Sequence, residues 1–187
     1  MKVYVYYFDN MGVREIAYAM SGFYNHIVTI AKEKRVYESC ENIKVVPDMT
    51  VSEVDPDDVD LLIIPGGNPD LICSDEGFKK LVLKLNEKGK YISGICAGAM
   101  AMARFGILDN KRANGDAEGF VIETEVDREA YKNVKIVPDG VVVDGNCITA
   151  ISRAAIEFAV ELSDVMGVYK NEQEKKEDYD WLKYLDR

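Results

Sequence analysis

Short runs of β-branched and aromatic residues alternate along the chain with segments whose apolar residues recur at helical spacing. The first run covers residues 3–8, a helical pattern covers 13–24, and a second strand pattern covers 27–31. Residues 59–64 then form a nearly continuous apolar run that stops at Pro65. A strand that is apolar on both faces is typical of the middle of a parallel sheet. The pattern therefore predicts a β-α-β order built around a buried sheet.

The same alternation continues after Pro65. A helical pattern at 76–88 precedes a strand at 91–95, which runs without a break into a second helical pattern at 97–105. Further strands are predicted as a short hairpin at 35–40 and 43–46 and as runs at 134–137, 141–143 and 146–151, and a last core helix is predicted at 154–166. We therefore predict a three-layer α/β/α sandwich with a mostly parallel sheet.

The final segment, residues 168–187, is highly charged but is not uniformly polar. Apolar and aromatic residues are interspersed among its charges: Tyr179, Trp181, Leu182, Tyr184 and Leu185. This mixture favours an amphipathic helix over a disordered tail. With 187 residues in total, the chain fits one domain at 1–167 followed by an appended helix at 168–187.

Charge and hydropathy exclude several classes of partner. The chain has 33 acidic and 23 basic residues, a net charge of −10, and this charge would repel a nucleic acid. No apolar run reaches the roughly 18 residues that a membrane span needs. The N-terminal residues lack the pattern of a signal peptide, so we expect a cytoplasmic protein.

The cysteines and the single histidine, His26, limit the metal and redox chemistry. Cys40, Cys73, Cys96 and Cys147 are widely spaced with no CxxC pair, so they resemble neither a zinc site nor a redox dithiol. We expect no metal or other cofactor, and we interpret Cys40, Cys73 and Cys147 as packing residues. His26 begins a predicted strand, where a structural role is favoured over an active-site role.

Cys96 is the strongest candidate for a functional residue. It stands where the strand at 91–95 turns into a helix, and it is flanked by small residues in the stretch GICAGA at 94–99. This arrangement is that of a nucleophile elbow with cysteine in place of serine. Because the helix N-terminus favours a negative charge, we expect Cys96 to be a reactive thiol rather than an inert buried one.

The motif around Cys96 is one of four that the chain shares with a known family. The others are residues 8–15 (FDNMGVRE), 61–67 (LLIIPGG), and 148–150 (ITA) followed by AIEFA. In these stretches the sequence resembles the ThiJ/PfpI family of the class I glutamine amidotransferase-like superfamily, whose members include protein deglycase and intracellular proteases or amidases. The resemblance implies a flavodoxin-like fold, a homodimer and Cys96 as the reactive centre.

The resemblance also implies roles for residues near Cys96. Glu15 matches an acidic side chain that hydrogen-bonds the elbow cysteine in its protonated form, although a carboxylate at the start of a helix can simply interact with the dipole. Gly66 and Gly67 match backbone donors that join the N–H of Ala97 in an oxyanion hole. A plain tight turn is the alternative for the two glycines.

The chain also departs from the family pattern. Amidases of the family carry histidine directly after the cysteine, where this chain has Ala97, and many members use a histidine further on, where this chain has Asp116. Asp116 is a candidate to orient a water or substrate hydroxyl, or is a solvated loop residue. Arg153 is a candidate to bind an anionic substrate group, or forms a surface ion pair. Without a Cys-His-acid triad, peptidase and glutaminase activities are disfavoured.

Two functions are consistent with these residues. The first is a cysteine-dependent hydrolase-like or lyase-like enzyme acting on a small electrophilic molecule such as an aldehyde, a glyoxal-type adduct, an amide or a nitrile. In it, Cys96 attacks, the oxyanion hole holds the developing charge and Glu15 transfers the proton. The second is a redox-sensing or stress-response protein in which Cys96 is oxidised.

Overall fold

A computed structural model describes residues 1–114, 122 and 124–184 of the chain. Its central sheet has seven strands in the order β10-β11-β7-β6-β1-β2-β5. These strands are β1 (Val3–Tyr7), β2 (Ile27–Ala31), β5 (Met49–Thr50), β6 (Leu61–Ile64), β7 (Tyr91–Ile95), β10 (Val141–Asp144) and β11 (Cys147–Ala150). All neighbouring pairs in the sheet are parallel except β10 and β11. The predicted, mostly parallel sheet is confirmed.

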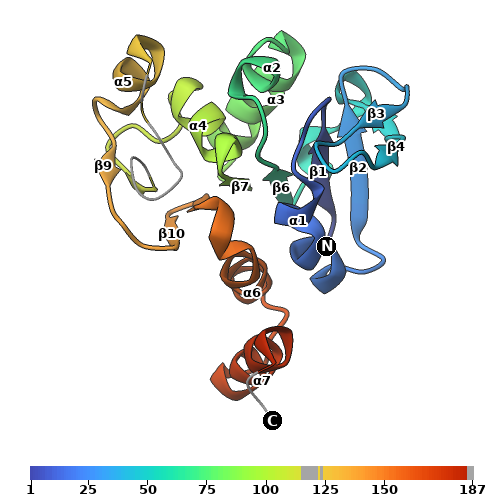
Figure 1. The fold of residues 1–187 in the computed structure, drawn as a ribbon, viewed down its shortest axis with the longest axis vertical. Coiled ribbons are helices and arrows are strands. Elements are labelled where there is room, and N and C mark those ends of the chain that lie inside the picture. Colours follow the sequence, from blue (N-terminus) through green and yellow to red (C-terminus); the bar gives the residue numbers. More distant parts are fainter. Residues whose placement is uncertain (115–121, 123, 185–187) are drawn as a thin grey trace.

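The innermost strands are apolar on both faces because helices cover both. Every residue of β1 and β6 is buried. Helices α1 (Val13–Gly22) and α6 (Ala155–Val165) pack together on one face, and α2 (Pro69–Cys73), α3 (Glu76–Glu87) and α4 (Ala97–Arg104) lie on the other, as Figure 1 shows. Together the layers form the expected three-layer, flavodoxin-like sandwich.

Within the described residues, two short two-stranded sheets and three short 3-10 helices lie around this core. The hairpin predicted before residue 47 forms from β3 (Tyr37–Glu38) and β4 (Lys44–Val45), which pair antiparallel. The strand predicted at 134–137 is present as β9 (Lys135–Ile136), which pairs in parallel with β8 (Arg112–Ala113). The 3-10 helices are η1 (Val51–Glu53), η2 (Pro56–Asp58) and η3 (Ser152–Ala154).

Two further helices in the described part of the chain pack against helices of the sandwich, and Tyr131 of the first is buried in the hydrophobic core. Helix α5 (Glu125–Tyr131) is linked to α4 by an ion pair between Arg104 and the buried Asp127, with 2.8 Å between the charged atoms. Helix α7 (Glu172–Lys183) has no fully buried residue and packs along α6. In Figure 1 it is the red helix next to the C-terminus, below α6.

Candidate active site

Cys96 stands at the turn between β7 and α4, at the carboxyl edge of the sheet. It is the N-cap of α4 and has φ 55° and ψ −124°, a positive-φ conformation that a non-glycine residue rarely adopts. The backbone N–H of Cys96 donates to the carbonyl of Ala150 at the end of β11, 2.8 Å away. The backbone therefore has the strained geometry expected of a nucleophile elbow.

Glu15 reaches this turn from the first turn of α1. Its side chain is buried, with 6% of the residue exposed. Glu15 Oε2 accepts a hydrogen bond of 3.0 Å from the backbone N–H of Gly66, and Oε1 accepts one from the hydroxyl of Ser152. The carboxyl group also hydrogen-bonds the thiol of Cys96. The structure thus brings Glu15 and Cys96 together, as the family resemblance implies.

Gly66 fills the narrow space between these two side chains. A Cβ at this position would lie 2.0 Å from Glu15 Oε2 and 2.8 Å from the Cβ of Cys96. Gly67 has φ +138°, and a Cβ there would lie 2.6 Å from the carbonyl oxygen of Asn10. Both glycines are therefore required by close approach, and Gly67 also by its backbone conformation.

Burial controls the ionisation of the pair. It raises the pKa of Glu15, although hydrogen bonds from Ser152 and Gly66 act in the opposite direction. Burial, followed by the neighbouring Glu15 carboxylate, raises the pKa of Cys96 to about 11, and the backbone N–H of Ala97 only partly offsets this increase. Desolvation thus opposes the effect of the helix N-terminus, which favours a negative charge on sulfur, and it is the larger effect on the pKa. The reactivity of Cys96 stays a prediction. Near neutral pH the pair retains a proton.

The other site residues predicted from the sequence differ in how they are placed around the elbow. The backbone N–H of Gly66, expected in an oxyanion hole, is instead engaged by Glu15. Ala97 directly follows the elbow and is buried. Arg153 is exposed in η3, one residue after Ser152. Asp116 lies outside the described residues.

Ser152 is a site residue that the sequence analysis missed. Ser152 comes shortly after β11, which pairs in parallel with β7 so that Ala150 lies opposite Ile95. This register places Ser152 beside the elbow. Its hydroxyl donates to Glu15 and also lowers the pKa of Cys96. The position of Ser152 just after a predicted strand at the carboxyl edge of a parallel sheet was the signal that could have identified it.

His26, the one histidine in the sequence, lies far from the elbow along the strand direction. It precedes β2, so it lies at the amino edge of the sheet, whereas Cys96 follows β7 at the carboxyl edge. His26 is exposed and its Nδ1 is 3.0 Å from the carbonyl oxygen of Met1. The active site therefore has no imidazole.

The other cysteines lie in different surroundings. Cys147 is buried in β11 and Cys73 is half-buried at the end of α2, in keeping with packing roles. Cys40 is exposed, so the expectation that it is a packing residue is wrong. Its backbone N–H donates to the carbonyl of Met11, which fixes the loop after β3 against the start of α1.

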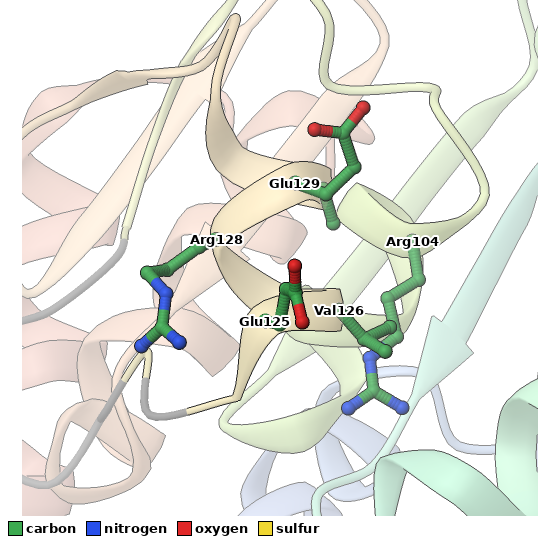
Figure 2. A pocket seen from close by; sticks show the side chains of 6 residues that line it. Arg104, Glu125, Val126, Arg128 and Glu129 are labelled. Atoms are coloured by element: carbon green, nitrogen blue, oxygen red, sulfur yellow. The ribbon is translucent and has the colours of Figure 1, made fainter.

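A surface cavity lies apart from this site. It has a volume of about 690 Å³ and is lined by residues of α4 and α5: Arg104, Glu125, Val126, Arg128, Glu129 and Ala130. Figure 2 shows Arg104 extending from α4 and Glu125, Arg128 and Glu129 projecting from α5. The guanidinium of Arg104 is held by Asp70 and Asp127, at 2.6 and 2.8 Å. Since neither Cys96 nor Glu15 lines this cavity, it is not the candidate active site.

The described residues contain neither a metal-binding cluster nor a helix that could span a membrane. Within residues 1–114, 122 and 124–184, His, Cys, Asp and Glu side chains form no group of three or more that could hold a metal ion. None of the helices in the described part of the chain combines the length and the apolar character that crossing a bilayer requires.

Comparison with known proteins places the chain in a family. Residues 1–165 match the DJ-1/PfpI family. The chain belongs to this family. It is 23% identical in sequence to a crystallised DJ-1 superfamily protein of Agrobacterium tumefaciens, with a TM-score of 0.78 and 100% of both chains covered. The fold of this DJ-1/PfpI family member is therefore shared with solved structures along its whole length.

Two curated relatives are more similar in sequence. An uncharacterized protein of Methanocaldococcus jannaschii is 36% identical over 112 residues, 58% of this chain and 52% of that protein. A protein named deglycase PfpI, from Pyrococcus furiosus, is 30% identical over 127 residues, 67% of this chain and 73% of that protein. The chain thus spans only about half the length of the first of these relatives.

Proposed function

We propose that this DJ-1/PfpI family member is a cysteine-dependent enzyme acting on a small aldehyde or 2-oxoaldehyde. The observation that carries the proposal is the contact between the Cys96 thiol, at a positive-φ elbow, and the buried carboxyl group of Glu15. A nucleophile and a proton acceptor within hydrogen-bond reach form the minimal unit of nucleophilic catalysis. The name of the Pyrococcus relative, a deglycase, supports carbonyl chemistry.

The ionisation of the pair suggests how attack begins. Since burial raises the pKa of Cys96 to about 11, the resting group is a thiol and its proton must leave as the new bond forms. Glu15 accepts this proton while the sulfur bonds to the carbonyl carbon, and the electron pair of the C=O bond moves onto oxygen. The backbone N–H groups of Gly67 and Ala97 are the candidates to stabilise that oxygen, because the N–H of Gly66 is already engaged by Glu15.

The same residues disfavour amide hydrolysis. Expulsion of an amine requires its protonation by a group that titrates near neutral pH, and imidazole is the usual donor. The single histidine of the chain lies at the opposite edge of the sheet. Carbonyl addition forms a hemithioacetal without an amine leaving group, so it fits a site served by one carboxyl group.

The alternative, a redox sensor, fits less well. Sensor cysteines are accessible and have a low pKa, because the thiolate is the form that reacts with peroxide. Cys96 is half-buried and burial raises its pKa. We therefore propose the enzyme as the primary function.

A substrate panel tests the proposal. Wild-type protein is incubated with glyoxal, methylglyoxal, a simple aldehyde, an amide and a nitrile, and product formation is followed by NMR. We expect conversion of the two 2-oxoaldehydes to their 2-hydroxy acids with uptake of one water, its loss in Cys96→Ala, and its retention in the control Cys40→Ala, which removes an exposed thiol. The simple aldehyde should add to Cys96 only reversibly, because it has no second carbonyl group to be reduced as its aldehyde carbon is oxidised. Equal conversion by wild type and Cys96→Ala would contradict the proposal. Stoichiometric oxidation of Cys96 by peroxide without any turnover would favour the sensor.

A further inference from the structure

The hydroxyl of Ser152 contacts both members of the reacting pair. It donates to Glu15 Oε1 across 137 positions of sequence, and it interacts with the thiol of Cys96. The residue is half-buried at the start of η3, where the register of β11 on β7 holds it next to the elbow. An inference about its role rests on the proposed function, since it concerns the proton that Cys96 releases.

The two oxygens of the Glu15 carboxylate have partners of different kinds. Oε2 accepts from the backbone N–H of Gly66, and an N–H group can only donate. Oε1 accepts from Ser152, and a hydroxyl can either donate or accept. A proton added to Oε2 would face the donor of Gly66, whereas a proton added to Oε1 can be accepted by Ser152 after its hydroxyl turns. A proton at Oε1 is therefore the one that the Ser152 hydroxyl can accept as a hydrogen bond.

We propose that Ser152 is a positioning residue whose hydroxyl turns from Glu15 to Cys96 as the proton moves between them. In the resting pair the Ser152 hydroxyl donates to Oε1, and Cys96 holds its proton. When the sulfur bonds to the carbonyl carbon of a small aldehyde, the thiol proton passes to Oε1 and the C=O electron pair moves onto oxygen. Ser152 then accepts from the Oε1 hydroxyl and points its own hydrogen at the sulfur. It gains and loses no proton overall.

This role can be measured without turnover, by the pH dependence of Cys96 alkylation with iodoacetamide. Wild type, Ser152→Ala and Ser152→Thr are compared, each with Cys40→Ala to remove the exposed thiol. Peptide mass mapping reports the modification of Cys96 alone. The matched control is Ser21→Ala, because Ser21 lies on the same helix as Glu15 and its hydroxyl donates to the carbonyl of Tyr18, 2.7 Å away.

The expected result is specific for a hydroxyl. Ser152→Ala should slow alkylation at neutral pH about tenfold, the scale of one hydrogen bond to a charged group, and should shift the pH profile upward. Ser152→Thr should restore most of the rate, and Ser21→Ala should match wild type. A folded Ser152→Ala variant with the wild-type profile would overturn the inference, as would a folded Ser152→Thr variant that behaves like Ser152→Ala.

Two outcomes separate the role of Ser152 from the proposed enzyme activity. If aldehydes are converted in a Cys96-dependent way but Ser152→Ala changes neither turnover nor alkylation, the role of Ser152 is wrong and the enzyme stands. If Ser152→Ala shifts the alkylation profile but wild type converts no substrate of the panel, the hydroxyl controls the thiol and the proposed enzyme is wrong.

Discussion

At the scale of single residues, the carboxyl group of Glu15 is buried, and burial disfavours its ionised form. Glu15 is 6% exposed, and burial raises its pKa above that of a glutamate in the unfolded chain. The folded state therefore holds a proton that the unfolded state releases as the pH rises between these two pKa values. Folding stability falls over that interval and stays lower above it. Glu15 thus lowers stability at neutral and alkaline pH while it serves the proposed chemistry.

Glu15→Gln tests this cost because glutamine keeps the shape of the side chain without its charge. At about pH 8 the variant should have the higher melting temperature, by a few degrees, since about 1 kcal/mol corresponds to roughly 2–4 °C in a chain of this size. Below about pH 4 the advantage should disappear, because the carboxyl group is then neutral in both states. Thermal unfolding at the two pH values measures this difference. If the variant were less stable than wild type at pH 8, the charge of Glu15 would not be lowering the free energy of unfolding.

Gly66→Ala tests the close approach of Gly66 to Glu15 and Cys96. The added Cβ would overlap Glu15 Oε2, 2.0 Å away, so the carboxyl group must move from Cys96 and from the N–H of Gly66. We expect a loss of about 1–3 kcal/mol in the free energy of unfolding, typical of overpacking, together with loss of aldehyde conversion.

The control for Gly66→Ala is Gly22→Ala at the end of α1. There the added Cβ meets only the hydroxyl of Ser163, which can rotate away. Urea unfolding and the aldehyde assay are run on both variants. Full activity in Gly66→Ala would mean that Glu15 and Cys96 need not be in contact.

Only part of the site was visible from the sequence. Cys96 and Glu15 lie within motifs that resemble the family, so local sequence was sufficient for them. Ser152 lies 137 positions from Glu15 in sequence, and only the pairing of β11 with β7 brings it to the site. The burial that raises the pKa of Cys96 is likewise a property of the whole fold, whereas a position at a helix N-terminus can be predicted from local sequence.

At the scale of elements, the placement of Glu15 depends on a cap supplied by a distant hairpin. Helix α1 has no side-chain cap from its own N-cap residue, Gly12. Instead, the carboxylate of Glu41, in the turn of the β3–β4 hairpin, accepts hydrogen bonds of 3.1 Å from the N–H groups of Val13 and Arg14. The hairpin thereby fixes the first turn of the helix that carries Glu15.

Glu41→Ala should therefore destabilise the protein in a pH-dependent way. Partial burial alone would raise the pKa of Glu41, but hydrogen bonds from Arg14, Ser39 and Val13 lower it to about 2. This contribution to stability is present above the unfolded pKa of about 4.3 and is lost as the pH falls toward about 2. We expect a cost of about 1 kcal/mol at neutral pH in urea unfolding. Glu38→Ala, an exposed residue of the same hairpin, is the control. An equal effect of the two variants would contradict the capping role.

Elements with a strong apolar pattern were predictable, and short elements held by tertiary contacts were not. The strands at 27–31 and 91–95 have the predicted bounds, since their burial is encoded in their own residues. Helix α2 and strand β5 were not predicted because they contain five and two residues. Helix α5 was not predicted either, since it has only seven residues.

At the scale of the whole molecule, charge pairs connect α7 to the sandwich. Lys175 Nζ lies 3.0 Å from Glu161 and 2.6 Å from Asp164, both on α6, and Lys183 pairs with Glu157. The fully buried core stops short of α7. The attachment of this helix is therefore more electrostatic than that of the helices in the sandwich.

Lys175→Gln should loosen α7 without disturbing the sheet. We expect a loss of about 1 kcal/mol or less, the usual range for exposed and half-buried pairs, and faster proteolysis within α7. Lys170→Gln is the control because Lys170 is far more exposed and pairs with Glu174 of α7 itself. Thermal unfolding and limited proteolysis in low and high salt measure both effects. No difference between the two variants would show that the ion pairs of Lys175 do not hold α7 on the sandwich.

The homodimer implied by the family resemblance stays a prediction, which light scattering of the purified protein checks.

In the proposed reaction, Cys96 attacks a carbonyl carbon while Glu15 takes its proton. The most direct test is the rate of methylglyoxal conversion as a function of pH in wild type, Glu15→Gln and Cys96→Ala. The wild-type rate should rise with pH through the raised pKa of Glu15, because only the carboxylate can accept the proton. Glu15→Gln should be slower by about 10²-fold, the scale of general acid–base catalysis, and should lack that rise. Cys96→Ala should be inactive. Conversion by Glu15→Gln at the wild-type rate and with the same pH dependence would show that Glu15 does not accept the proton of Cys96.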